Sequence, residues 1–409
     1  MSVFVPPLAV TRLSLYFCGI CWLNGRVPRA RAKTKSKLSE ADLRNWKLLA
    51  EFQRRLQPVL EKAPVSDTEL DARRKLLSAD YFSLILFGLL NPVLKSMRGL
   101  VEASALPRMQ VEVCRHQVSL GSFSEMQHLV DPELLAGLLR SLAAEAGPSF
   151  GDPKVREQIG ELVANDGTLL PALPRMAWAL WQDSQNRAAK LHLELSVWRD
   201  VPAEFTVTEG KRCERSVWRQ KLRPEVCYVN DRHYAQDYGL IKEVQAVGAR
   251  HVLRLCHNAL ITPLEAPRAL STADLAAGVV ADCLVRLGGG TDGPTGRLVR
   301  VEADGHVFLL CTNLMEAPAE LIALIYRHRW RVELFFKWLK CILGCRHWLA
   351  ESPTGVMVQV YCALIASVLI VRWTGRKPTK RQWEMLQLYW VGWAEVGDLE
   401  RIFGVKKPA

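Results

Sequence analysis

The pattern of hydrophobic and polar positions changes character twice along the chain. Up to about residue 147, apolar residues recur at helical spacing, as in the run DPELLAGLLRSLAAEA. From about residue 158 short strand-like runs take over, and after about residue 317 the spacing is helical again. The predicted parts are a basic arm, a helical N-terminal domain, an α/β domain and a helical C-terminal region, over residues 1–38, 39–150, 151–350 and 351–409.

The middle of the chain predicts a layered α/β fold. The predicted strands are IGELVAND, LHLELSVW, EFTVTEG, VCYVND and HVLRLC, with helices CERSVWRQKL and YGLIKEVQAVG between them. Between Ala259 and Gly305 glycine-rich turns separate two hairpin-like runs, which predicts a β-rich insertion at about 259–305. HVFLLCTNL adds one strand, and a single long helix is then predicted from near Ala317 to about Leu343.

The N-terminal segment allows more than one interpretation. Residues 13–23 are as apolar as a signal-peptide core, but no small-residue cleavage site follows, and six basic residues come between Arg26 and Lys37. The basic run could touch phosphates, or it could be a solubilising or misassigned leader. The helical run that opens at Ser39 fits a helix-turn-helix or a plain helical bundle.

A second apolar stretch, residues 356–371, is short of the ~20 residues that span a bilayer. We therefore expect a buried core helix and no membrane partner. The 11 scattered cysteines favour a reducing compartment, so the cytoplasm is expected. Cys18 and Cys21 lack a second pair for zinc, and GGGTDGPTGR lacks the Lys of a nucleotide-binding loop, so no nucleotide is expected.

Charge narrows the class of partner. The chain has 54 Lys and Arg against 42 Asp and Glu, a net charge of +12. Such an excess favours a polyanion, because basic side chains neutralise phosphates and release counterions. Nucleic acid is the leading candidate, ahead of an anionic membrane surface.

The segment YRHRWRVELFFKWLK gathers chemical groups on one helix face. At about 100° per residue, Arg329, Glu333 and Lys340 fall within about 60° of Tyr326, and Trp330 and Lys337 lie beside them. The opposite side carries apolar residues, and core packing is favoured for Trp338. A solvated face of an ordinary amphipathic helix would give the same pattern.

Two aspartates strengthen the functional interpretation. Asp166 follows a predicted strand and precedes Gly167, and Asp231 ends another. We expect both at strand termini, where metal ligands are readily presented. Either one alone would be read as a turn or cap residue, so the hypothesis depends on Asp166, Asp231 and Glu333 together.

Tyr326, Arg329, Glu333 and Lys340 are separated by two, three and six residues. With this spacing, with DGTLL at residues 166–170 and with NDRHY at residues 230–234, the chain resembles the DDE-type insertion-sequence transposases of the IS-four family. The resemblance covers roughly residues 70–395. One departure is His233, since the family usually has glycine at that position.

The resemblance implies an RNase H-like core, with a mixed sheet flanked by helices and a β-rich insertion. It implies that Asp166, Asp231 and Glu333 are catalytic residues holding two Mg²⁺ ions, which Mn²⁺ could replace, for cleavage and strand transfer on DNA. The implied DNA-binding residues are Tyr326, Arg329, Trp330, Lys337 and Lys340. The implied partners are the element's terminal inverted repeats, target DNA and a second copy of the chain in a synaptic homodimer, close to the nucleoid.

Two alternatives stay open at this stage. The first is a transposase-derived DNA-binding protein that has lost catalysis, against which the three intact carboxylates argue. The second is an RNase H-like nuclease or resolvase, against which the full Tyr-Arg-Glu-Lys spacing argues.

Overall fold

The computed structural model describes residues 47–63, 74–94, 96–149, 151–173, 176–180, 186–343, 348–374 and 377–403. Several expectations fall outside these residues. They are the basic arm over residues 1–38, with its apolar stretch and its cysteine pair, and the helix start at Ser39.

All strands of the described chain join one nine-stranded sheet with the order β3-β2-β1-β4-β5-β9-β8-β7-β6. The strands are β1 (Glu161–Pro171), β2 (Ala188–Ser196), β3 (Val201–Glu209), β4 (Val226–Asn230), β5 (Arg250–Arg254), β6 (Ile261–Pro263), β7 (Val279–Leu287), β8 (Thr295–Ala303) and β9 (His306–Thr312). The five strands predicted before residue 256 are all present. The α/β fold class is therefore confirmed.

Strands β1 to β5 form the mixed half of the sheet. β1 pairs in parallel with β4, and β4 with β5, whereas β2 lies antiparallel between β1 and β3. A mixed sheet is what the resemblance implies. β4 is buried along its whole length, as expected for a central parallel strand covered on both faces.

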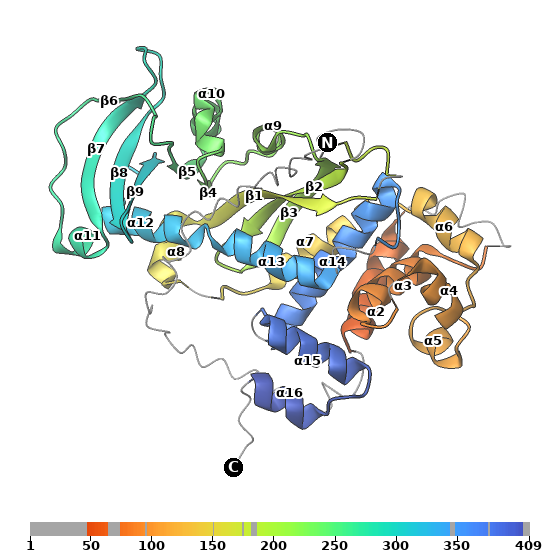
Figure 1. The fold of residues 1–409 in the computed structure, drawn as a ribbon. Coiled ribbons are helices and arrows are strands. Elements are labelled where there is room, and N and C mark those ends of the chain that lie inside the picture. Colours follow the sequence, from red (N-terminus) through yellow and green to blue (C-terminus); the bar gives the residue numbers. More distant parts are fainter. Residues whose placement is uncertain are drawn as a thin grey trace, which may run out of the picture.

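The helices cover both faces of this half (Figure 1). α9 and α10 pack on one face, and α7, α12, α13 and α14 pack on the other. The helices are α2 (Lys47–Lys62), α3 (Ser78–Leu90), α4 (Met97–Ala103), α5 (Pro107–Glu112), α6 (Leu120–Leu129), α7 (Glu133–Glu145), α8 (Pro153–Ile159), α9 (Glu214–Arg219), α10 (Tyr238–Ala246), α11 (Thr272–Ala276), α12 (Ala319–His328), α13 (Arg331–Leu343), α14 (Pro353–Thr374), α15 (Lys380–Trp390) and α16 (Val396–Phe403), with the short 3₁₀ turn η2 (Tyr234–Gln236).

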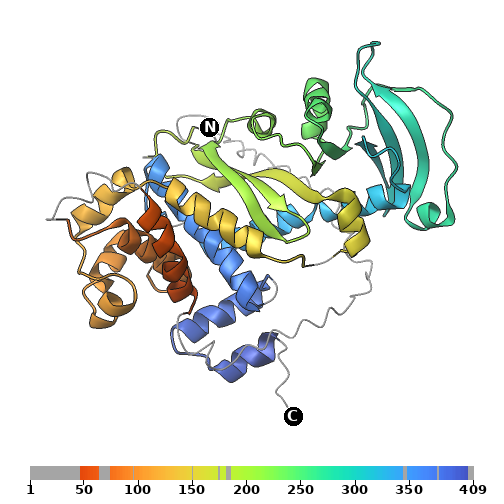
Figure 2. The ribbon, with the colours of Figure 1, turned by 180° about the vertical axis from the view of Figure 1, so that it is seen from behind.

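α14 lies at the centre of the helical layer, where it packs against α3, α7 and α13 (Figure 2). By length and composition it could cross a membrane, but 83% of its most apolar window is buried inside the fold. This agrees with the expectation of a core helix for residues 356–371. Because α14 packs on α2, α3 and α7, the two ends of the described chain share one hydrophobic core.

The β-rich segment expected at 259–305 holds β6, β7 and β8, and β9 joins them to β5. This extension stands at one end of the molecule, opposite helices α2 to α6 (Figures 1 and 2). Its strands are all antiparallel to their neighbours. The insertion is therefore a continuation of the main sheet and has no separate sheet of its own.

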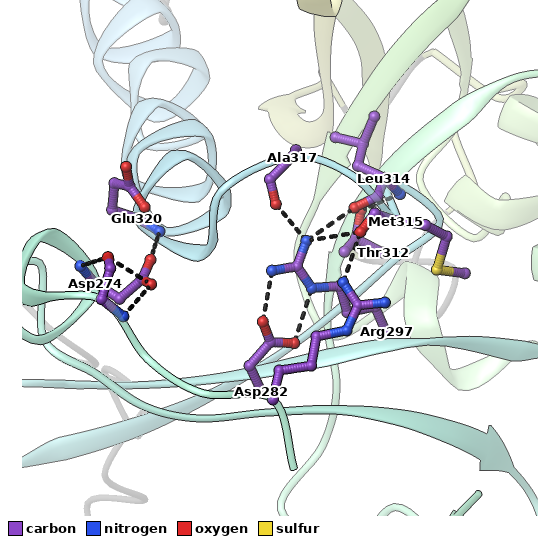
Figure 3. A network of polar contacts seen from close by, with 10 residues as sticks. Asp274, Asp282, Arg297, Thr312, Leu314, Met315, Ala317 and Glu320 are labelled. Atoms are coloured by element: carbon purple, nitrogen blue, oxygen red, sulfur yellow. Dashed lines mark hydrogen bonds and ion pairs between the residues drawn. The ribbon is translucent and has the colours of Figure 1, made fainter. Parts of the chain in front are cut away.

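A buried polar network fastens the extension to the start of α12 (Figure 3). Arg297 of β8 donates two hydrogen bonds to Asp282 of β7, of 2.8 and 2.5 Å, and further bonds to the carbonyls of Leu314, Met315 and Ala317. These carbonyls belong to the loop that leads into α12. The extension thus fixes the loop that leads into α12, the first of the two helices that carry the Tyr-Arg-Glu-Lys residues.

The long helix predicted to run to Leu343 is two helices, which corrects that expectation. α12 ends at His328 and α13 begins at Arg331, and the junction is closed by the short-range bonds Arg329 N to Tyr326 O and Val332 N to Arg329 O. Both sides of the junction are held by the turn between β2 and β3. The ring of His328 lies edge-on to Trp198, and Arg331 pairs with Asp200 at 2.9 Å.

Candidate active site

Asp166 lies in the middle of β1, not at a strand end, so that expectation was wrong. The strand continues to Pro171 because β2 pairs with β1 along that whole stretch. The parallel partner β4, in contrast, stops pairing at Ala164 opposite Val229. Asp166 therefore stands just beyond the point where β1 loses one of its two neighbours.

Two asparagines that the sequence analysis did not single out join β1 to β4 at this point. The side-chain oxygen of Asn230 accepts bonds from the backbone N–H of Asn165, at 2.9 Å, and from its side chain, at 3.2 Å. Both asparagines are buried, and each directly precedes one aspartate. The repeated Asn-Asp pair was the available sequence signal, and its effect is to hold the backbones before Asp166 and Asp231 together.

Asp231 directly follows β4, as predicted. Its carboxylate accepts a hydrogen bond of 2.8 Å from the backbone N–H of His233, which forms a tight Asx turn. His233 has φ −65° and ψ −40°, an ordinary right-handed conformation that any residue can adopt. The replacement of the family's glycine by His233 therefore imposes no backbone strain.

The junction of α12 and α13 brings the signature residues next to the aspartates. Arg329 donates a hydrogen bond of 2.5 Å to Glu333, at the start of α13. The positive charge of Arg329 is close enough to lower the pKa of Asp166. The negative charge of Asp231 is close enough to raise the pKa of the buried Tyr326 hydroxyl. The structure thus brings Asp166, Asp231, Tyr326 and Arg329 within electrostatic reach of one another, and Glu333 is linked to them through Arg329.

The electrostatics of this point are those of crowded carboxylates. Burial raises the pKa of Asp166 to about 8, and the like charges of Asp231 and Glu214 add to the increase, against the opposing charge of Arg329. Burial also raises the pKa of Tyr326, although Arg329 and Arg254 act in the opposite direction. A cation placed between the aspartates would relieve this repulsion.

The donor set suits a hard divalent cation in part. Carboxylate oxygens are the ligands that Mg²⁺ prefers, and Asp166 and Asp231 supply them as a pair. Glu333 is engaged by Arg329 instead. Within the described ranges no group of three or more His, Cys, Asp or Glu side chains is close enough to hold a metal ion. The two aspartates therefore fit a cation. Glu333 could join them only if its ion pair with Arg329 were broken.

The other residues expected to bind DNA lie at the junction of α12 and α13 and along α13. The cationic groups of Arg329 and Lys337 lie 5.8 and 5.7 Å from the ring centre of the half-buried Trp330. Lys337 is exposed, and Lys340 is half-buried in the last turn of α13. Trp338 is buried against Trp383, which confirms core packing for that residue.

With this geometry established, residues 157–369 match the model of the transposase DDE domain, which is more than half of the chain. The chain belongs to the transposase DDE domain family. Domains of this family cleave DNA strands and transfer them, and they generally use divalent metals.

Two relatives are named as transposases. One, y4zB of Sinorhizobium fredii, is 28% identical over 210 residues, which are 50% of this chain and 58% of the relative. The other belongs to insertion sequence element IS5377 of Geobacillus stearothermophilus and is 29% identical over 217 residues, 52% of this chain and 55% of the relative. The chain thus matches little more than half the length of these relatives.

Among solved structures, a piggyBac transposase synaptic complex with hairpin DNA covers 90% of this chain, and 81% of that chain is covered in turn. Its TM-score is 0.41 and its sequence identity is 11%.

Proposed function

We propose that this protein is an insertion-sequence transposase that cuts and joins DNA with divalent metal at Asp166, Asp231 and Glu333. Family membership supports the class of reaction. The observation that carries the residue assignment is the convergence of two buried strands and one helix junction on these carboxylates. The matched relatives, one named as a putative transposase and the other as a probable transposase for an insertion sequence element, agree with the proposal.

Each carboxylate has a distinct route to the proposed metal site. Asp166 and Asp231 are held side by side by the asparagine contact, so they would be the preformed ligands. Glu333 would complete the set. Two bound Mg²⁺ ions, or Mn²⁺ in their place, would supply activation of a water or a 3′-hydroxyl and neutralise charge on the leaving oxygen.

The pairing of Arg329 with Glu333 suggests how DNA and metal binding are coupled. A DNA phosphodiester offers Arg329 two acceptor oxygens and one negative charge, as the Glu333 carboxylate does, so it can replace Glu333 as the partner of Arg329. If Arg329 turns to the phosphate, the Glu333 carboxylate becomes available to the aspartate pair. DNA binding would thereby assemble the third ligand only when a scissile strand is present.

The remaining signature residues would hold the DNA. Tyr326, Arg329, Lys337 and Lys340 would contact backbone phosphates, and Trp330 would stack on an unpaired base. The net charge of +12 supports a polyanionic partner. All five belong to α12, α13 or their junction, so one rigid segment would position the strand against the carboxylates.

The larger organisation is also part of the proposal. The helical region 39–150 would recognise the element's terminal inverted repeats, residues 151–350 would be catalytic, and 351–409 would complete the core. Holding two element ends requires two active sites, so we propose a homodimer in the synaptic complex. The protein would act in the cytoplasm, at the nucleoid.

The first test is incubation of the purified protein with DNA carrying its own genomic flanks, in Mg²⁺, in Mn²⁺ and in EDTA. Asp231→Asn removes one proposed ligand, and Asp292→Asn, a change to an exposed aspartate paired with Lys242, is its matched control. The expected result is metal-dependent cutting at a fixed position by wild type and by Asp292→Asn, with none by Asp231→Asn. Binding without cutting by wild type would contradict the proposal and favour a DNA-binding protein without catalysis.

A further inference from the structure

A fourth carboxylate, Glu214 at the start of α9, lies directly behind Asp166 on the other face of β1. Successive residues of a strand point to opposite faces, so Gly167 faces α9 while Asp166 faces the α12–α13 junction. A side-chain carbon added to Gly167 would lie 2.5 Å from the Glu214 carboxylate oxygen. Because position 167 is glycine and has no side chain, the Glu214 carboxylate can lie close to the backbone next to Asp166.

Glu214 also reaches the second motif. Tyr234, in the turn that follows Asp231, lines the same small cavity as Glu214, and the charge of Glu214 acts on its buried hydroxyl. Tyr234 is almost fully buried and lies edge-on to Trp218, another residue of α9, with ring centres 5.4 Å apart. Glu214 thus contacts the residue after Asp166 and, through Tyr234, the turn that begins at Asp231.

A small polar cavity adjoins Glu214 and Asp166. Its volume is about 20 Å³, which is room for a single water molecule. His192 and Glu194 line it from β2, and both are more than nine-tenths buried. His192 Nδ1 and one oxygen of Glu194 have no hydrogen-bond partner within the described chain. Buried polar atoms without a partner cost free energy, so the region behind Asp166 is suited to polar contacts with a water molecule or a ligand.

The charge of Glu214 is incompletely neutralised. Lys190 forms an ion pair with its carboxylate at 3.7 Å and also donates a hydrogen bond of 3.0 Å to the carbonyl of Arg212, and the charge of Glu214 still acts on Asp166. The negative charge of Glu214 therefore adds to that of the two aspartates. A divalent cation in front of β1 would experience the field of all three groups.

We propose that Glu214 is a positioning residue for Asp166 and Asp231, which sets their affinity for divalent metal through Gly167 and Tyr234 without binding the metal itself. This inference rests on the proposed function, since it assumes that the two aspartates are metal ligands. Groups that orient ligands from behind typically change metal affinity or activity by about 10- to 100-fold when they are removed. The expected signature is therefore weaker metal binding with DNA binding left intact.

The test is calorimetric titration of the metal-free protein with Mn²⁺, alongside the rise in melting temperature that Mn²⁺ produces. Glu214→Gln keeps the shape and removes the charge. Glu243→Gln is the matched control, because Glu243 pairs with Arg219 of the same helix at 2.8 Å, away from the aspartates. Tyr234→Phe, which deletes only the hydroxyl, is the second variant.

We expect Glu214→Gln to weaken Mn²⁺ binding by about 10- to 100-fold and to bind DNA in EDTA as wild type does. Tyr234→Phe should shift Mn²⁺ binding in the same direction by less, and raised Mn²⁺ should restore cleavage by Glu214→Gln. Wild-type Mn²⁺ affinity in Glu214→Gln, with cleavage by the wild-type protein intact, would overturn the inference alone. A wild-type protein that neither binds Mn²⁺ nor cleaves would overturn the proposed function and this inference with it.

Discussion

Two arginine–carboxylate pairs show how the extension and the junction of α12 and α13 differ. Arg297 and Asp282 are each only 4% exposed, and the guanidinium is surrounded by Asp282 and three backbone carbonyls. Arg329 and Glu333 are 11% and 28% exposed, and their contact is a single hydrogen bond next to the buried carboxyl of Asp166.

We call the Arg297–Asp282 pair closed, because it is buried and its guanidinium also binds three carbonyls. We call the Arg329–Glu333 pair open, because it is partly exposed and consists of one hydrogen bond. Each of the three guanidinium nitrogens of Arg297 already donates to an acceptor of the fold, so the side chain contributes to the fold. An arginine with one acidic partner at a partly exposed junction can exchange that partner for a phosphate. The two pairs thus differ in the number of acceptors that the guanidinium binds, and under the proposed function this difference leaves Arg329 able to bind a phosphate.

The largest effect is expected from breaking the closed pair. Arg297→Met leaves Asp282 as an unpaired buried charge, which should lower the free energy of unfolding by about 3–5 kcal/mol. Urea denaturation measures this change. Lys242→Met, which breaks an exposed pair with Asp292, should cost under about 1 kcal/mol.

Combining Arg297→Met with Asp282→Leu should recover much of the loss, because the double variant buries no charge. An Arg297→Met protein as stable as Lys242→Met would show that the closed pair does not anchor the extension.

Breaking the open pair should affect chemistry instead. Glu333→Gln keeps the helix and removes a proposed ligand, so cleavage should fall by roughly a hundred- to a thousandfold, at about 1.4 kcal/mol for each factor of ten. Filter binding should give unchanged DNA affinity in EDTA. Glu384→Gln breaks a comparable helical pair with Lys380 and should cleave normally; equal losses of cleavage and binding in Glu333→Gln would argue against a ligand role.

The crowding at Asp166 predicts a pH dependence of the metal-free protein. Because its folded pKa is raised to about 8, this carboxyl is protonated in the folded chain and charged in the unfolded chain between about pH 4 and 8. Stability should therefore fall as the pH rises through that range. Asp166→Asn removes the effect, so its melting temperature in EDTA should exceed that of wild type by more at pH 8 than at pH 5. A constant difference would show that Asp166 does not titrate in this way.

The smallest effect is expected at the end of α13. Lys340→Ala should weaken DNA binding moderately and lower the slope of log affinity against log salt by about one unit. Lys380→Ala, at an exposed position of α15, is the control. An unchanged salt slope in Lys340→Ala would remove Lys340 from the proposed phosphate contacts.

The sequence predicted the fold class, the succession of strands along the chain and Asp231 at a strand end, because these features depend on local alternation and turn residues. It misplaced Asp166, since Gly167 resembles a turn residue and only the long-range pairing with β2 extends β1 to Pro171. The helix break at Arg329 and Trp330 has no local signal, because no glycine or proline stands there. Contacts with Trp198 and Asp200, more than 120 residues earlier in the chain, accompany that break.

The sequence named the residues of the candidate site but did not predict how they lie relative to one another. Helical spacing alone brought Tyr326, Arg329 and Glu333 to one side, and the ion pair between Arg329 and Glu333 agrees with it. Glu214 could not be singled out, because it is one acid within a basic stretch and its role depends on the space above Gly167. Neither fact is visible until the sheet is assembled.

The ordinary backbone at His233 has a consequence for how mobile elements are catalogued. If copies are sorted by the letters of a short motif, the missing glycine at position 233 counts as a departure from the family. Here the dihedral angles at this position place no demand on glycine, so the substitution is no evidence of decay. Copies that share a histidine at this position would be better ranked by their carboxylates than by the motif as written.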